Sequence, residues 1–169
     1  MTTVGIVGGT GPAGRGVAIR LATGGYEVVL GSRVAERASE IAAQLSTNST
    51  RPIVGGLNTE AASCEIVVIA TPWDSALSTV RELAPLLNGK IVVSMVNALS
   101  KVGKEMIPLY PPRGSMAAQI AQQLPHSKIV GAFHHLPAAQ MENLDSGLQA
   151  DVMIFGDDEN ANDIVATLV

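Results

Sequence analysis

A short apolar run that leads into a glycine-rich turn near the N-terminus constrains the fold of this chain most strongly. Residues 4–7 are apolar or glycine, and residues 9–14 read Gly-Thr-Gly-Pro-Ala-Gly, which fits the pattern G-x-G-x-x-G. An amphipathic segment follows, so the stretch predicts a strand, a tight turn and a helix whose N-terminus can bind a pyrophosphate. The expected pyrophosphate-binding residues are Gly9, Thr10, Gly11, Pro12, Ala13 and Gly14.

Each glycine of this pattern has an expected steric role. Gly9 is expected to permit the tight turn, Gly11 to let a pyrophosphate approach the backbone, and Gly14 to let the helix pack against the strand. Pro12 suits the first helical position, because the N–H that it lacks has no intrahelical partner there.

The end of the second apolar run indicates which dinucleotide would bind. This run, 27–30, ends about twenty residues after the turn, where NAD-selective sites usually carry Asp or Glu for the ribose 2′-hydroxyl. Here the residues are Gly31, Ser32 and Arg33. A hydroxyl and a guanidinium can donate to a 2′-phosphate, and Arg37 adds positive charge, so the pattern predicts NADP. The alternative interpretation of Ser32 and Arg33 is an ordinary helix cap and a solvated charge. An aspartate in place of Gly31 would be expected to shift the preference toward NADH.

The alternation of strand-like and helix-like segments along 169 residues predicts one α/β domain. Strands are expected at 4–7, 27–30, 66–70, 91–93, 128–133 and 152–155, with a weak strand at 52–54. Helices are expected at 12–23, 34–45, 74–87 and 115–124, with an acidic helix start at 157–159. This order is typical of a Rossmann-type doubly wound, mostly parallel sheet with helices on both faces and the strand order 3-2-1-4-5-6.

Composition narrows the class of protein and its partners. Hydrophobic residues make up 47% and charged residues 15% of the chain, which favours a heavily buried sheet over disorder. The net charge of −4 and the lack of a basic run argue against nucleic acid and against a membrane surface as partners. One Cys and three His give no structural zinc spacing, so no metal is expected. The N-terminus lacks the basic leader of a signal peptide, which makes the cytoplasm the default location.

Three segments at the expected carboxyl ends of strands are candidates for the reacting part of a ligand, because ligands bind at that edge of an open α/β sheet. They are Thr71-Pro72-Trp73, Ser94-Met95-Val96-Asn97 and His134-His135-Leu136-Pro137. A proline-rich stretch at 108–115 is expected to form a flap over the same end. Trp73 fits either a pocket wall or a core residue at a helix start. His134 and His135 fit either proton donors or packed histidines.

The sequence contains no evident catalytic constellation. Asp74 and Glu65 have no spaced carboxylate partner, and Ser94 does not lie in a Gly-x-Ser-x-Gly setting. Hydride transfer between two organic redox carriers needs rings that are close together and screened from water more than it needs a strong acid or base. The chain is therefore suited to such a transfer.

Together these motifs resemble the NADPH-dependent reductases of coenzyme F-420 (F420), over nearly the whole chain. The most specific of them are Gly-Ser-Arg at 31–33, Pro-Trp at 72–73 and His-x-x-Pro-Ala-Ala at 134–139. The resemblance implies that Thr10, Ser32 and Arg33 hold the 2′-phosphate of NADP(H). The nicotinamide would lie at the strand ends that carry Thr71, Pro72, Ser94 and Met95. The deazaflavin side of the site would be lined by His134, Leu136 and Pro137, with direct hydride transfer between the two rings.

The resemblance also implies a homodimer and a further helical part that closes the deazaflavin cleft in family members. Residues 1–169 are expected to form a single NADP-binding domain without that part. Two other functions stay open at this point. One is an NADPH-dependent reductase of a small carbonyl or imine, with His134 or His135 as the proton donor. The other is a non-catalytic NADP(H)-binding module.

Overall fold

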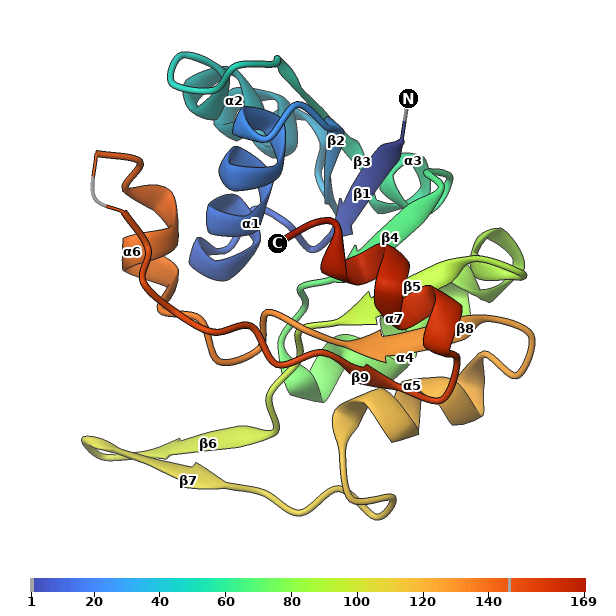
Figure 1. Cartoon of the computed structure of the whole chain (residues 1–169). Coiled ribbons are helices and arrows are strands. Elements are labelled where there is room, and N and C mark those ends of the chain that lie inside the picture. The colour runs from blue at the N-terminus through green and yellow to red at the C-terminus, as the bar shows by residue number, and fades with distance from the viewer. Residues whose placement is uncertain (1, 146) are drawn as a thin grey trace.

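The structure, a computed structural model, describes residues 2–145 and 147–169 and is built around one large sheet. Its strands are β1 (Thr3–Val7), β2 (Glu27–Ser32), β3 (Ile53–Leu57), β4 (Ile66–Ile69), β5 (Ile91–Ser94), β8 (Lys128–Gly131) and β9 (Phe155–Gly156). The seven strands lie in the order β3-β2-β1-β4-β5-β8-β9 (Figure 1). Neighbours are parallel except β8 and β9, which are antiparallel. The predicted doubly wound sheet and its order 3-2-1-4-5-6 are confirmed, with β8 in the sixth place.

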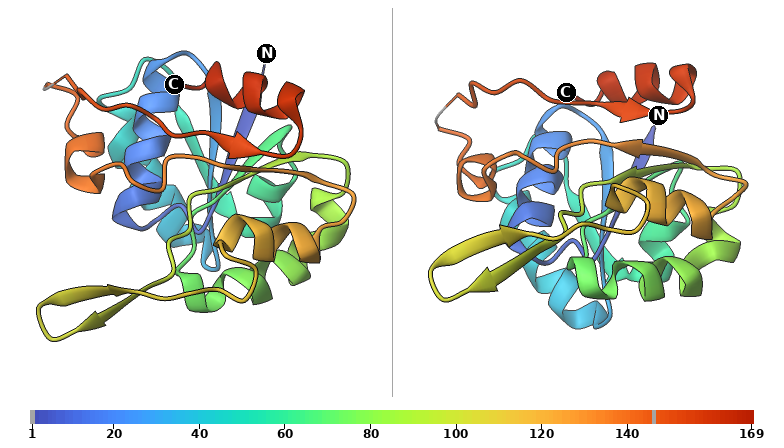
Figure 2. Two further views of the ribbon diagram at one scale, coloured as in Figure 1. Left: turned by 60° about the horizontal axis from the view of Figure 1, so that its bottom comes forward. Right: turned by 90° about the horizontal axis from the view of Figure 1, so that it is seen from below.

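Helices cover both faces of the sheet (Figure 2). They are α1 (Pro12–Thr23), α2 (Ala35–Ser46), α3 (Asn58–Ala62), α4 (Trp73–Leu87), α5 (Met116–Gln123), α6 (Ala138–Glu142) and α7 (Glu159–Ala166). One apolar cluster joins the sheet to α1, α2, α6 and α7, and a second joins it to α3, α4 and α5. Every residue of β4 is buried, because a central parallel strand is covered on both faces and therefore needs a continuous Val/Ile run.

The predicted boundaries are mostly within two residues of the observed ones, as is usual for helix and strand ends. One predicted strand is two residues too long, and another has the wrong bounds. The strand expected at 128–133 ends at Gly131, and Phe133 adopts a left-handed φ of 62°, which turns the chain out of the sheet. In place of the strand expected at 152–155, only Phe155 and Gly156 form a strand, because these are the residues that pair with β8.

Sequence analysis missed a hairpin that projects from the body of the molecule (Figures 1 and 2). It consists of β6 (Leu99–Val102) and β7 (Glu105–Pro108), which pair antiparallel around a two-residue turn. Gly103, the first residue of that turn, has a φ of 61°, which is the conformation that a type II′ hairpin turn needs. The short helices α3 and α6 were not predicted either. No helix within the described residues is long and apolar enough to cross a membrane.

Candidate active site

The turn between β1 and α1 has the shape of a phosphate-binding turn. Gly8 adopts a left-handed φ of 71°, and its N–H donates to Asn58 Oδ1 at 3.0 Å. A Cβ atom at Gly14 would lie 2.6 Å from the Cα of Gly9, so the helix packs directly on the turn. A Cβ atom at Gly11 would meet no atom of residues 2–145 and 147–169 within 4 Å, so the space beside Gly11 is open to a ligand.

The steric role predicted for Gly9 needs a correction, and Gly14 lets the helix pack closely on Gly9 of the turn rather than on the strand itself. The left-handed residue of the turn is Gly8. Gly9 is required for a different reason, since a Cβ atom there would lie 2.6 Å from Leu30 Cδ1. Gly9 is also tied to the second strand, because its N–H donates to the carbonyl oxygen of Gly31 at 2.9 Å.

Helix α1 begins without a side-chain cap, which leaves its N-terminus available to an anion. Gly11 is the N-cap, Pro12 follows it, and the first turn contains no acidic residue. The first N–H groups of a helix have no intrahelical partners, and the helix dipole places partial positive charge there. Ala13 and Gly14 lie in this first turn, so the pyrophosphate of a dinucleotide fits the site.

The end of β2 lies beside this turn. Ser32 is only 8% exposed, and its Oγ accepts from the N–H of Val34 at 3.2 Å. Val34 is the N-cap of α2, so the interpretation of Ser32 as that helix cap is wrong. Arg33 follows the strand and Arg37 lies in the first turn of α2, and both are exposed. The corner thus offers two guanidinium groups and a hydroxyl.

Gly31 cannot carry the acidic residue that NAD-selective sites use. A Cβ atom there would lie 2.8 Å from Ala61 Cβ, 3.0 Å from Asn58 Oδ1 and 3.1 Å from the carbonyl oxygen of Ile6. An aspartate at this position would therefore disturb the sheet before it could reach a ribose. The effect of Gly31→Asp on cofactor preference stays a prediction, and these contacts indicate that the substitution would also strain the fold.

The segment after β4 touches the phosphate turn. A Cβ atom at Gly8 would lie 2.6 Å from Thr71 Cγ2, and Thr71 Oγ1 is buried without a hydrogen-bond partner among the described residues. A buried hydroxyl without a partner is costly, so Oγ1 is a candidate to bind a polar group of a ligand. Pro72 is the N-cap of α4, and Trp73 begins that helix with 40% exposure. Trp73 thus lies at a helix start, outside the core.

A cavity of about 270 Å³ lies beside the ends of β5 and β8, and we call it the acceptor cavity. Its walls include Ser94 at the end of β5, Asn97 after that strand, His134 after β8 and Phe155 of β9. The predicted flap at 108–115 also contributes to its walls, through Pro108, Leu109, Pro111, Gly114 and Ser115. The cavity therefore brings together two of the three predicted segments.

His134 is half-buried in the wall of this cavity, and its surroundings disfavour the charged form of the imidazole. Burial lowers the pKa of His134. The positive charge that His135 can carry lowers this pKa further, because the two ring centroids are 4.9 Å apart. Nδ1 of His134 is buried and has no hydrogen-bond partner among the described residues, and Asn97 Nδ2 donates to its backbone oxygen. His135 instead lies at the surface, where its Nε2 is 2.7 Å from the carbonyl oxygen of Asp151.

Three of the predicted residues do not line the acceptor cavity. Met95 is buried in the core, Leu136 packs against the same core cluster, and Pro137 is the N-cap of α6. Their contacts with a cofactor remain predictions.

Two supporting residues were missed because their partners are far away in sequence. Asn58, at the start of α3, holds Gly8 through the 3.0 Å hydrogen bond. Arg20 of α1 holds the end of α6, since its guanidinium donates to the carbonyl oxygens of Gln140, Met141 and Asn143. Arg15 adds an ion pair with Glu142 at 3.1 Å. The segment after His134 is thus fixed to the helix that begins at the phosphate turn.

Comparison with known proteins identifies the family of the chain. The profile of the family described as NADP oxidoreductase coenzyme F420-dependent matches residues 3–98. The chain belongs to this family. An F420-dependent NADP reductase of Methanocaldococcus jannaschii is 36% identical over 98% of this chain and 77% of its own length. The protein of the same description from Methanothermobacter marburgensis is 27% identical, over 98% of this chain and 77% of its own length.

Solved structures share the fold of this F420-dependent NADP oxidoreductase family member. A proposed F420-dependent NADP reductase from Arthrobacter sp. FB24 has a TM-score of 0.81 and 28% identity, over 99% of this chain and 79% of that one. Plasmodium falciparum pyrroline carboxylate reductase with NADP bound has a TM-score of 0.63 and 17% identity, over 99% of this chain and 53% of that one. The second likeness concerns the fold alone.

Proposed function

We propose that this protein transfers a hydride between NADP(H) and coenzyme F420. The observation that carries the proposal is the pairing of an open, uncapped phosphate turn at Gly11 with a strand end that offers Ser32 and Arg33 and no carboxylate. The family of the chain and the F420-dependent NADP reductases among its relatives support the same two redox carriers.

The dinucleotide side of the site is formed by β1, β2 and β4. The first turn of α1 would hold the pyrophosphate, with Thr10 beside it. The 2′-phosphate would be held by Ser32 and Arg33, because charge-assisted hydrogen bonds from a guanidinium are stronger than neutral ones. Thr71, with its unpartnered Oγ1, and Ser94 would orient the nicotinamide end. Arg37 would add positive charge without a fixed contact.

The acceptor side is formed by the ends of β5, β8 and β9. With both carriers bound, NADPH would supply a hydride and the oxidised deazaflavin would take it up together with one proton, which gives NADP+ and the reduced deazaflavin; the reverse direction would release that proton. Because burial lowers the pKa of His134 and so disfavours its protonated form, it would act as a hydrogen-bonding group at the acceptor rather than as the proton donor. The flap at 108–115 would help to exclude water from the reacting rings.

Anaerobic mixing of the purified protein with NADPH and oxidised F420 tests the proposal. We expect the visible absorbance of the deazaflavin to disappear with NADPH and to change little with NADH. A small carbonyl and a cyclic imine serve as alternative acceptors in parallel. Tight NADPH binding without any loss of F420 absorbance would contradict the proposal, and turnover of the imine in its place would favour the reductase alternative.

We further propose that the protein acts in the cytoplasm as a homodimer, with residues 1–169 as one NADP-binding domain. The family resemblance supports the dimer. Light scattering tests it, since a dimer has twice the 17.5 kDa mass of the chain.

A further inference from the structure

Phe155 is an aromatic side chain at the acceptor cavity that sequence analysis did not select. It begins β9, where it pairs with Gly131 of β8, and it is 39% exposed. Its ring makes an edge-to-face contact with the ring of His134, with 5.6 Å between the centroids and 79° between the planes. An exposed apolar ring therefore stands beside the histidine of the proposed acceptor side.

Gly131 allows this ring to lie across the sheet. A Cβ atom at Gly131 would lie 2.2 Å from Phe155 Cζ and 2.6 Å from both of its Cε atoms. The ring thus fills the space that a side chain at position 131 would need. Gly131 pairs on its other side with Ser94 of β5, so the ring is placed close to the strand end that carries Ser94.

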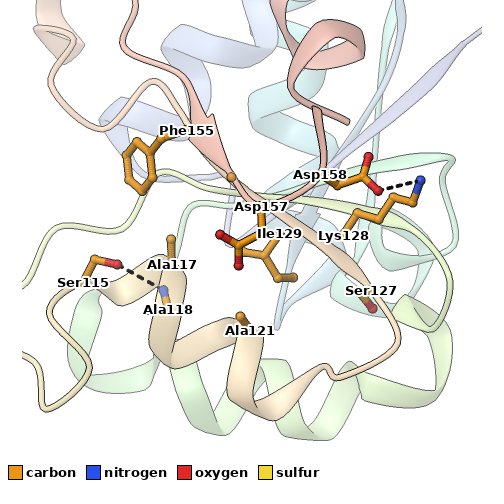
Figure 3. Close-up of a pocket in the computed structure, with 11 residues that line it drawn as sticks. Ser115, Ala117, Ala118, Ala121, Ser127, Lys128, Ile129, Phe155, Asp157 and Asp158 are labelled. Atoms are coloured by element: carbon orange, nitrogen blue, oxygen red, sulfur yellow. Dashed lines mark hydrogen bonds and ion pairs between the residues drawn. The ribbon is translucent and has the colours of Figure 1, made fainter. Parts of the chain in front are cut away.

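Phe155 also lines two cavities. The acceptor cavity and a second cavity of about 400 Å³ share Ser115, Ala117 and Phe155 in their walls. Figure 3 shows the Phe155 ring at one end of the second cavity and the Lys128–Asp158 ion pair at the other. This ion pair is 3.0 Å long, and the carboxylate of Asp157 lies nearby in the same cavity. The walls of the second cavity therefore contain charged side chains, whereas those of the acceptor cavity contain the aromatic rings of His134 and Phe155.

We propose that Phe155 is the aromatic wall against which the flat deazaflavin ring packs, and that it confines this ring to the acceptor cavity. The inference rests on the proposed function. Aromatic rings gain from offset or edge contacts beyond the area that they bury, so a planar tricyclic ring is the kind of ligand that this wall favours. Phe155 touches the acceptor in this proposal and takes no part in proton transfer.

Binding of F420 without NADPH tests the proposal separately from turnover. In Phe155→Ala we expect the Kd for oxidised F420, followed by quenching of its fluorescence, to rise about tenfold. The KM for F420 should rise similarly, while the Kd for NADPH stays unchanged. Phe155→Tyr retains the ring and should restore F420 binding. Gly131→Ala should also weaken F420 binding, because the new methyl group displaces the Phe155 ring.

Met153→Ala is the matched control, since Met153 lies on the same segment, is 61% exposed and lines neither cavity. Its Kd for F420 should equal that of the wild type. F420 binding by Phe155→Ala within about twofold of an active wild type would overturn the inference and leave the proposed function intact. A wild type that neither binds nor reduces F420 would overturn both.

Discussion

Replacing Gly11 or Gly14 by alanine separates the two physical reasons for which the phosphate turn contains glycine. At Gly14 the methyl group would lie 2.6 Å from the Cα, 2.7 Å from the carbonyl oxygen and 2.9 Å from the carbonyl carbon of Gly9. Ordinary contacts between carbon atoms are about 3.5–4.0 Å, and all three atoms belong to the backbone. Helix α1 must therefore move, and overpacking of this kind costs about 1–3 kcal/mol of the free energy of unfolding.

At Gly11 the methyl group would enter open space, and the backbone, with φ −77° and ψ 165°, suits any residue. Alanine stiffens the unfolded chain, which stabilises the fold by about 0.4–1 kcal/mol, and it is a poorer N-cap by a similar amount. These effects nearly cancel. The open space is where the pyrophosphate would approach, so one charge-assisted hydrogen bond of about 1.5–3 kcal/mol is lost. This loss corresponds to a Kd about 10- to 150-fold higher.

Urea denaturation and fluorescence titration with NADPH and NADH measure the two effects. Gly14→Ala should unfold at lower urea, and heating should show a midpoint lower by about 2–12 °C. Gly11→Ala should keep the wild-type midpoint and bind both dinucleotides more weakly by the same factor, because the pyrophosphate is common to them. Wild-type affinity in Gly11→Ala, or wild-type stability in Gly14→Ala, would refute the steric argument.

Three further changes address other parts of the site. Arg33→Ala should raise the Kd for NADPH about tenfold and the Kd for NADH less than about twofold, because only NADPH carries the 2′-phosphate; equal losses in parallel titrations would remove this assignment. Burial lowers the pKa of His134 in the folded state below its ordinary 6.5, so the unfolded chain binds the proton more tightly. The free energy of unfolding should therefore fall as the pH drops through 6.5. His134→Gln should flatten that part of the stability profile measured in urea, and an unchanged slope would contradict the lowered pKa of His134. Arg20→Gln should cost about 1–3 kcal/mol of unfolding free energy and speed amide exchange in α6, and wild-type exchange there would show that the guanidinium does not hold this helix.

The parts of the fold that the sequence predicts are those with local signals. The strand, turn and helix from Thr3 to Thr23 are readable because each signal lies within a few residues of the element it defines. The Val/Ile run of β4 identifies a central parallel strand in the same way. The hairpin of β6 and β7 was missed because its strands are exposed and mix polar with apolar residues, which leaves Gly103 as its main signal.

The acceptor side shows why part of the site could not be predicted. Phe155 lies in a segment that reads as an ordinary apolar strand, and nothing in that segment marks the ring as part of a site. Its position depends on an antiparallel pairing with β8 and on the absence of a side chain at Gly131. A glycine in a strand indicates a bulge or a close approach, but it does not say which side chain approaches.

The dinucleotide side also contains two kinds of residue. Those that would contact the ligand can be predicted from local sequence, whereas those that hold the contacting residues in place cannot. Ser32 and Arg33 are recognised from their distance along the chain to the glycine turn. Asn58 reads locally as a residue at a helix start, yet its side chain holds the N–H of Gly8 and lies beside Gly31. Only the sheet order brings Asn58 close to Gly8 and Gly31. Strand β1 lies between β2 and β4 and so meets the chain that connects β3 to β4. Selectivity between dinucleotides can therefore be predicted from local sequence, whereas the support that positions the turn follows from topology.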